Sequence, residues 1–327
     1  MVSTIFMKLD CAAHESHLVL KQTTLKTYID YAWSLRAGLL LQKSTIAMLP
    51  SFVPELPDGT ERGRFVAMDL GGTNLRVMIM EIETGEKMRT KQFNTRMPNA
   101  AMHGTGEQLF DYIAKALADF LIEKDLADEN LPVGFTFSYP CDQTGLRSAT
   151  LLRFSCSFLR RKCPCAQTIV EIKAPRIKVE VVALINDTVG TMVAAAYEAN
   201  GECDIGVIIG NNLIKSDNNK KRDGSGTGTN ASYMENSKKI IHGLANASEP
   251  YKHKQMIIDT EWGGFGDNGE AEYIFTQYDK IVDERSDHPG VNSLDKLVAG
   301  MCMGEIVRLV LAKLCTHKVY LGHIGLQ

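Results

Sequence analysis

The stretch Phe65–Val77 holds the residues whose types and spacing are best suited to chemistry. Asp69 stands near the end of an apolar segment, the pair Gly71-Gly72 follows, and Thr73-Asn74 lead into a second apolar segment. Adjacent glycines let backbone N–H groups converge on one point, and such concave sites bind phosphate oxygens. A Gly-Gly hairpin turn is the plainer interpretation of the glycines alone. The neighbouring aspartate favours phosphate, because it could hold the magnesium of a nucleoside triphosphate, directly or through water.

A second candidate carboxylate, Asp187, follows the apolar segment Ile177–Ile185 and precedes a helix expected over 189–199. Taken alone, such an aspartate more often caps the helix, a role that stabilises it by about 1 kcal/mol. The alternative is catalytic, because strand ends in α/β sheets direct side chains into the ligand crevice. There a carboxylate can accept the proton of an attacking hydroxyl group.

Two further polar turns have a structural and a functional interpretation. Thr227–Asn230 is either a hairpin that closes a flexible loop or a second phosphate contact facing the first. Glu284 lies in the charged cluster Asp283–Ser286, and most such clusters are solvated surface turns. A functional role for either turn therefore depends on the rest of the sequence.

Gly264, Gly266 and Gly269 satisfy the G-x-G-x-x-G spacing of dinucleotide-binding folds, with acidic residues near the expected distance. However, Glu261 and Trp262 come directly before these glycines, and a dinucleotide-binding turn has no use for them. The spacing alone is a weak signal. We therefore favour a polar binding turn built around Glu261.

The elements that must position these residues alternate between strands and helices. Apolar residues at Leu109, Ile113, Leu117 and Leu121 predict an amphipathic helix over 107–126 that covers a sheet. The order of three strands, a helix and a strand indicates an α/β layered domain. We expect strands at 64–70, 75–82, 87–94, 133–137, 177–185, 204–210 and 255–260, and helices within 25–48 and over 189–199 and 294–314.

Composition excludes several classes of protein. The 327 residues carry 36 Lys and Arg against 39 Asp and Glu, and this balance predicts neither a nucleic-acid-binding nor a membrane-binding surface. Of the eight cysteines only Cys163 and Cys165 lie close together, which argues against a zinc site. No apolar run approaches the length of a membrane span or of a secretion signal. The sequence predicts a reduced, cytoplasmic protein.

In order and spacing, the polar segments together resemble the hexokinase family over most of residues 45–315. That resemblance implies the actin-like sugar kinase fold, with two ribonuclease-H-like lobes around a cleft, and transfer of the ATP γ-phosphoryl group to a hexose 6-hydroxyl, the first step of glycolysis. The expected domains are an N-terminal helical segment at 1–60, a small lobe at 61–187, and a large lobe at 188–327 with a low-complexity loop at 211–226. The matching blocks are Phe65–Val77, Leu131–Cys141, Ile185–Met192, Thr227–Glu235, Glu261–Gly269 and Tyr278–Leu314.

The resemblance also implies a role for each site residue. Asp187 matches the general base, and Asp69 matches the residue near Mg²⁺. Carboxylates and amides suit a hexose, because they bond its ring of hydroxyl groups and reject analogues that lack one. The implied hexose ligands, with glucose as the expected sugar, are Ser138, Ser155, Asn186, Asn230, Glu261 and Glu284. The implied contacts of ATP are Asp69, Gly71, Gly72, Thr73, Asn74, Thr227 and Gly228.

The sequence departs from the family pattern in three places. Where the family has Trp-Thr-Lys-Gly-Phe, this chain has Phe154–Phe158, and Cys156 replaces a lysine aimed at developing charge. Residues 159–176 and 211–226 replace regular segments, and the family continues past the equivalent of Gln327 through an adenosine-binding region. The expected second lobe and its lobe-closing C-terminal segment are therefore incomplete. Two alternatives follow: a non-catalytic sugar-binding or regulatory protein without the nucleotide half, and an unstable, inactive product.

Overall fold

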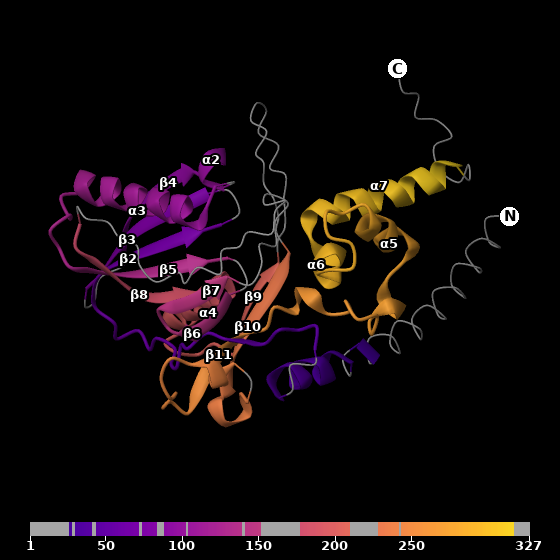
Figure 1. The fold of residues 1–327 in the computed structure, drawn as a ribbon, viewed down its shortest axis with the longest axis horizontal. Helices are drawn as coiled ribbons and strands as arrows, with labels where there is room; N and C mark the ends of the chain where they lie inside the picture. The colour runs from indigo at the N-terminus through magenta and orange to yellow at the C-terminus, as the bar shows by residue number, and fades with distance from the viewer. Residues whose placement is uncertain are drawn as a thin grey trace, which may run out of the picture.

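The computed structural model arranges the chain around two main β-sheets with helices packed on them (Figure 1). The structure describes residues 26–27, 30–40, 44–71, 74–83, 88–102, 104–138, 141–151, 177–209, 228–241 and 243–316. The segments expected to be irregular at 159–176 and 211–226 lie outside these ranges. None of the helices in these ranges is long and apolar enough to cross a lipid bilayer.

The first sheet has five strands in the order β4-β3-β2-β5-β8. The pairs β4–β3 and β3–β2 are antiparallel, whereas β2–β5 and β5–β8 are parallel. Three antiparallel strands followed by parallel ones confirm the expected ribonuclease-H-like lobe. The strands are β2 (Gly63–Leu70), β3 (Asn74–Ile82), β4 (Arg89–Arg96), β5 (Leu131–Phe137) and β8 (Val179–Ile185).

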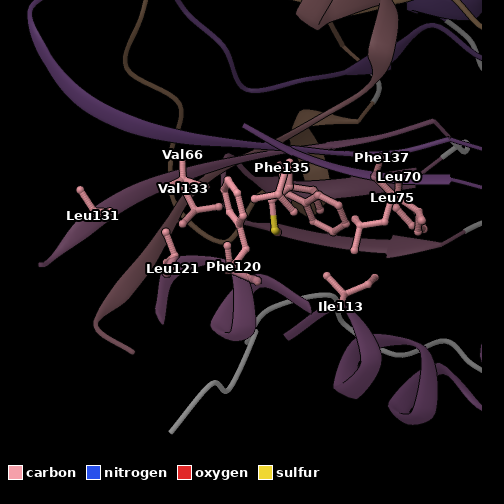
Figure 2. Packing of buried hydrophobic residues seen from close by; sticks show 14 of the residues in the cluster. Val66, Leu70, Leu75, Ile113, Phe120, Leu121, Leu131, Val133, Phe135 and Phe137 are labelled. Carbon is pink, nitrogen blue, oxygen red and sulfur yellow. The ribbon is translucent and has the colours of Figure 1, made fainter. Parts of the chain in front are cut away.

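The core of this lobe lies between the sheet and helix α3 (Gly106–Glu123), as Figure 2 shows. The apolar residues of α3 recur every three or four positions, so Ile113, Leu117 and Leu121 are fully buried against the sheet. Strand β5 alternates buried and partly buried residues, and it directs Phe135 and Phe137 into the same core. This is the arrangement that the spacing of apolar residues predicts. A short helix, α2 (Asn99–Met102), precedes α3.

Helix α3 begins with a reciprocal capping box. The Thr105 hydroxyl accepts a hydrogen bond from the Gln108 amide, and the Gln108 side chain accepts one from the Thr105 amide. We expect Thr105→Ala to lower the free energy of unfolding by about 1 kcal/mol, because an N–H of the first turn loses its partner. Urea denaturation measures this loss. Thr105→Ser, which keeps the hydroxyl group, serves as the control, and equal losses in both variants would contradict the capping role.

The second sheet has the order β1-β11-β10-β9, and every described pair in it is antiparallel. Helix α4 (Asp187–Glu198) packs on this sheet, with Val189 and Met192 fully buried. The packing is close because β9 presents Gly206, where a Cβ atom would lie 2.6 Å from the Thr188 carbonyl oxygen. The strands are β1 (Leu49–Pro50), β9 (Ile205–Ile209), β10 (Thr229–Asn236) and β11 (Gln255–Asp259).

Residues 44–60 do not continue the helix expected to reach residue 48. The described helical residues end at 40, and Leu49-Pro50 form β1, paired with the end of β11. Ile46 and Met48 are buried with Phe265 in the core beneath the second sheet. Burial against a distant strand therefore overrides the helical spacing of this segment.

The remaining elements differ in part from expectation. The helix expected at 294–314 is divided by Ala299, whose backbone is extended, into α6 (Ser293–Val298) and α7 (Gly300–Thr316). Sequence reasoning missed the hairpin of β6 (Cys141–Gly145) and β7 (Ser148–Leu151) and helix α5 (Gln277–Glu284). Short 3₁₀ turns complete the described chain at Ser237–Lys239, Leu244–Asn246, Trp262–Gly264 and Glu272–Ile274.

Candidate active site

Three neighbouring parallel strands end at the same edge of the first sheet, and each delivers a polar side chain there. Asp69 lies near the end of β2, Ser138 follows β5, and Asp187 comes two residues after the end of β8. The register aligns these ends, because Asp69 pairs with Thr136 and Thr136 with Ile185. The carboxyl edge of a parallel sheet is where α/β proteins bind ligands. The topology thus brings together three site residues that lie far apart in the sequence.

Asn186, rather than Asp187, caps helix α4. The Asn186 side-chain oxygen accepts a hydrogen bond from the Thr188 amide at 2.8 Å, and Asp187 occupies the first helical position. The Asp187 carboxylate instead accepts a hydrogen bond from the Ser138 hydroxyl group. Burial raises the pKa of Asp187, the Ser138 hydrogen bond lowers it, and the charge of Asp69 raises it again. Asn186 is therefore the capping residue, although the Asp187 carboxylate also accepts from the Thr188 amide, and Asp187 is a partly buried carboxylate of raised pKa.

The structure describes both ends of the phosphate-motif segment, Phe65–Val77. The Asp69 carboxylate forms an ion pair with Arg76 at 3.3 Å, and burial raises its pKa against the opposing effect of that arginine. The Gly71 amide donates to the Asn74 carbonyl oxygen at 3.1 Å, which joins the end of β2 to the start of β3. Gly72 and Thr73 lie outside the described residues. Phosphate binding by this turn stays a prediction.

The second sheet contributes a polar cluster that faces Asp187. The Asn230 side-chain amide on β10 donates to Asp259 Oδ1 at 2.8 Å and to Glu261 Oε1 at 2.9 Å. The Asn186 amide also donates to Glu261 Oε1, at 3.4 Å. Asn186, Asn230 and Glu261, three of the predicted hexose ligands, are therefore joined by hydrogen bonds between elements of both sheets.

The carboxyl groups in this cluster are close enough to perturb one another. Burial raises the pKa of Asp259 to about 7, and burial together with the charge of Asp259 raises the pKa of Glu261 well above its ordinary value. Asp187 adds to both shifts. Since Asp69 also acts on Asp187, this carboxylate lies between the phosphate-motif residue and the polar cluster.

Sequence reasoning missed Asp295 on α6. Its Oδ1 accepts a hydrogen bond from the Thr229 amide at 2.7 Å, and its charge contributes to the raised pKa of Glu261. Gly228 and Gly263 pack closely around it, because a Cβ atom at either glycine would lie within 2.6 Å of the Asp295 carboxyl group. One signal in the sequence was the start of a helix after Asn292-Ser293, but nothing local places that helix beside β10.

The other predicted ligands are less well supported. Glu284 is exposed at the end of α5 and makes no hydrogen bond to the described polar cluster, so its role stays a prediction. Gly228 lies beside the cluster with a left-handed backbone, whereas Ser155 and Thr227 fall outside the described residues. The dinucleotide alternative is wrong, because Gly264–Gly269 follow an antiparallel strand and form turns instead of opening a helix.

The donor set fits a magnesium–nucleotide complex in part. The charge of Asp69 raises the pKa of Asp187 at the sheet edge, and a divalent cation would relieve this repulsion. Within the described ranges no three His, Cys, Asp or Glu side chains gather into a metal-binding group. Magnesium commonly keeps several waters and binds through one or two carboxylates plus substrate phosphates. Asp69 is therefore the residue that would hold it.

A mixed five-stranded sheet beside a second sheet, with a carboxylate at their junction, defines an actin-like sugar kinase fold. Among solved structures, the hexokinase from Schistosoma mansoni complexed with glucose matches with a TM-score of 0.74 and 36% identity, covering 94% of this chain and 66% of that chain. Another hexokinase crystal structure matches with a TM-score of 0.65 at 25% identity.

The chain belongs to the hexokinase family. Two family models described as hexokinase match residues 11–197 and 225–325. A hexokinase from Brugia malayi is 63% identical over 290 residues, which cover 87% of this chain and 48% of that relative. Human hexokinase HKDC1 is 40% identical over 313 residues, 91% of this chain and 31% of that protein. The chain thus spans about half the length of one relative and about a third of the other.

Proposed function

We propose that this chain carries the catalytic base and hexose site of a hexose kinase, and that it transfers the γ-phosphoryl group of ATP to the 6-hydroxyl of glucose. The observation that carries this proposal is the position of Asp187. Its carboxylate interacts with Ser138 and Asp69 on one side and with the Asp259–Glu261 cluster on the other. The choice of sugar is supported by the membership of this chain in the hexokinase family and by the glucose complex of the Schistosoma hexokinase.

The polar cluster suits a hexose because it contains several directional acceptors and donors. Glu261, Asn186 and Asn230 are already linked by hydrogen bonds, so little side-chain entropy is lost when a sugar replaces some of these partners. A buried carboxylate that accepts from a sugar hydroxyl makes a charge-assisted bond. An analogue without that hydroxyl would leave the carboxylate unpaired, and this gives the site its selectivity.

In the reaction, Asp187 accepts the proton of the 6-hydroxyl as that oxygen attacks the γ-phosphorus and the bond to the ADP oxygen breaks. Ser138 holds the Asp187 carboxylate by a hydrogen bond, which orients it toward the hydroxyl. When bound, Mg-ATP supplies the phosphoryl group and the positive charge that balances the phosphates. Asp69 would hold the magnesium, and the segments around Gly71 and Gly228 would contact the phosphates.

A coupled assay of glucose phosphorylation, run beside a thermal-shift titration with glucose, tests this proposal. Turnover together with a glucose-dependent rise in the melting temperature is the expected result. A glucose shift without turnover would indicate the sugar-binding protein instead, and the absence of both signals would remove the proposal. No feature of the described residues favours the sugar-binding alternative over the kinase.

Asp295 and Glu284 give a direct test of which acidic residue completes the hexose site. We expect Asp295→Asn to weaken glucose binding by about 1–3 kcal/mol, or roughly 5- to 150-fold, because the proposed charge-assisted contact of this partly buried carboxylate to a sugar hydroxyl would be lost. The asparagine oxygen can still accept from the Thr229 amide, so the fold should be retained.

Glu284→Gln is the matched variant, and we expect it to change the glucose Kd by less than about twofold, since an exposed side chain contributes little. Titration calorimetry on both variants gives the comparison. A large effect at Glu284 with a small one at Asp295 would reverse the assignment.

A further inference from the structure

Asp259 is a buried acid for which the proposed reaction has no use. It ends β11 with 5% of its surface exposed, and its Oδ1 accepts from the Asn230 amide at 2.8 Å. The Thr188 hydroxyl lies 3.5 Å from the same oxygen but makes its shorter hydrogen bond, 2.8 Å, to Asn186 Oδ1. The Glu261 carboxyl group lies within hydrogen-bonding reach of Asp259, and two carboxyl groups can bond each other only through a proton.

The surroundings of this pair are acidic. Asp187 on α4 and Asp295 on α6 face it, and Cys141 on β6 lies near it with its thiol pKa raised to about 12, mainly by burial. Strand β10 offers the uncharged Asn230, and β1 consists of Leu49-Pro50. Within the described ranges no lysine or arginine forms an ion pair with Asp259 or Glu261. Two ionised carboxylates here would repel each other without compensation.

We propose that Asp259 is a positioning residue for the hexose: it holds one amide hydrogen of Asn230 and shares a single proton with Glu261, and the hexose binds only to this singly protonated pair. The inference rests on the proposed hexose site. With one proton in the pair, the pair keeps one negative charge and a carboxylate oxygen that can accept from a sugar hydroxyl. With two protons that acceptor is lost, and with none the repulsion separates the carboxylates and moves Asn230.

As the pH rises, the affinity for the hexose should therefore pass through a maximum and then fall at alkaline pH. Burial raises both pKa values, that of Asp259 to about 7 and that of Glu261 well above its ordinary value, so the pair loses its last, shared proton on the alkaline side of pH 7. An asparagine at this position mimics the protonated acid permanently, because its oxygen can accept from Asn230 while its amide donates to Glu261. Asp259→Asn should thus keep the affinity and lose its alkaline decline.

The test is titration calorimetry of glucose binding to the full chain between pH 6 and pH 9, in buffers with different ionisation enthalpies. For the wild type we expect the Kd to rise about tenfold for each pH unit above the loss of the proton, with proton uptake on binding in that range. For Asp259→Asn we expect a glucose Kd that stays constant at alkaline pH and no proton uptake on binding. Asp128→Asn, at a fully exposed aspartate, is the matched control and should follow the wild type.

The outcomes separate this inference from the proposed function. Glucose binding that is independent of pH, without proton uptake by the wild type, would remove the shared proton and leave the hexose site intact. An unchanged alkaline decline in Asp259→Asn would place the proton elsewhere and also overturn the inference. If the wild type binds no glucose at any pH, the inference and the proposed function fall together. Since proton uptake is measured on the wild type, the test does not depend on the folding of the variant.

Discussion

Asp187→Asn should lower kcat for glucose phosphorylation by about 10²–10⁴-fold while the glucose Kd changes by only a few fold. A general base contributes this much to a rate, and asparagine cannot accept the proton of the 6-hydroxyl. Binding should persist, because the asparagine oxygen can still accept from the Ser138 hydroxyl group. The fold should also persist, since the substitution removes a partly buried charge of raised pKa. A selective loss of kcat is what distinguishes a base from a residue that only shapes the site.

The measurement combines the coupled assay with calorimetric glucose titration on the same preparations. Asp119→Asn, at an exposed aspartate on α3, is the control for an aspartate-to-asparagine change outside the site. The pH dependence adds a second criterion. Because the pKa of Asp187 is raised in the folded chain, the acid side of the wild-type kcat/KM profile should lie above the ordinary aspartate value of about 4. A variant that keeps more than about a tenth of the wild-type kcat would exclude Asp187 as the base.

Phe135→Ala should lower the free energy of unfolding by about 3–5 kcal/mol, the range for truncating a buried aromatic residue. Phe135 is 1% exposed, and its ring centre lies 5.8 Å from that of Phe137 in the core of the first lobe. It belongs to β5, which separates β2 from β8 and therefore spaces Asp69 from Asp187. The variant is expected to lose glucose binding on heating well before the wild type does.

Urea and thermal unfolding measure this effect, with a fall of about 10 °C in the melting temperature expected. Ile122→Ala is the control, because Ile122 is a large apolar residue on the exposed side of α3 and should change stability by less than about 0.5 kcal/mol. Equal effects of the two substitutions would mean that the sheet–α3 interface is not the main core of this lobe.

Local patterns determine much of this protein. The alternation of apolar residues in β2, β3 and β5 and the helical spacing in α3 depend only on which face of each element is buried, so they can be found in the sequence. The placement of Asp69 and Asp187 at the ends of apolar strands is equally local, and it predicts their meeting at a sheet edge. The family motifs extended this reasoning to Asn186, Asn230 and Glu261, which the structure joins by hydrogen bonds.

Tertiary structure alone decided the rest, because it depends on which distant elements pack together. Asn186 rather than Asp187 caps α4, and Ser138, which follows the neighbouring strand β5, bonds the Asp187 carboxylate. The break at Ala299 turns α6 so that Asp295 reaches the Thr229 amide. Asp259 pairs with Ser232 across β10 and β11, and this register brings it beside Asn230. Sequence spacing carries no record of such contacts, because their partners lie tens of residues away.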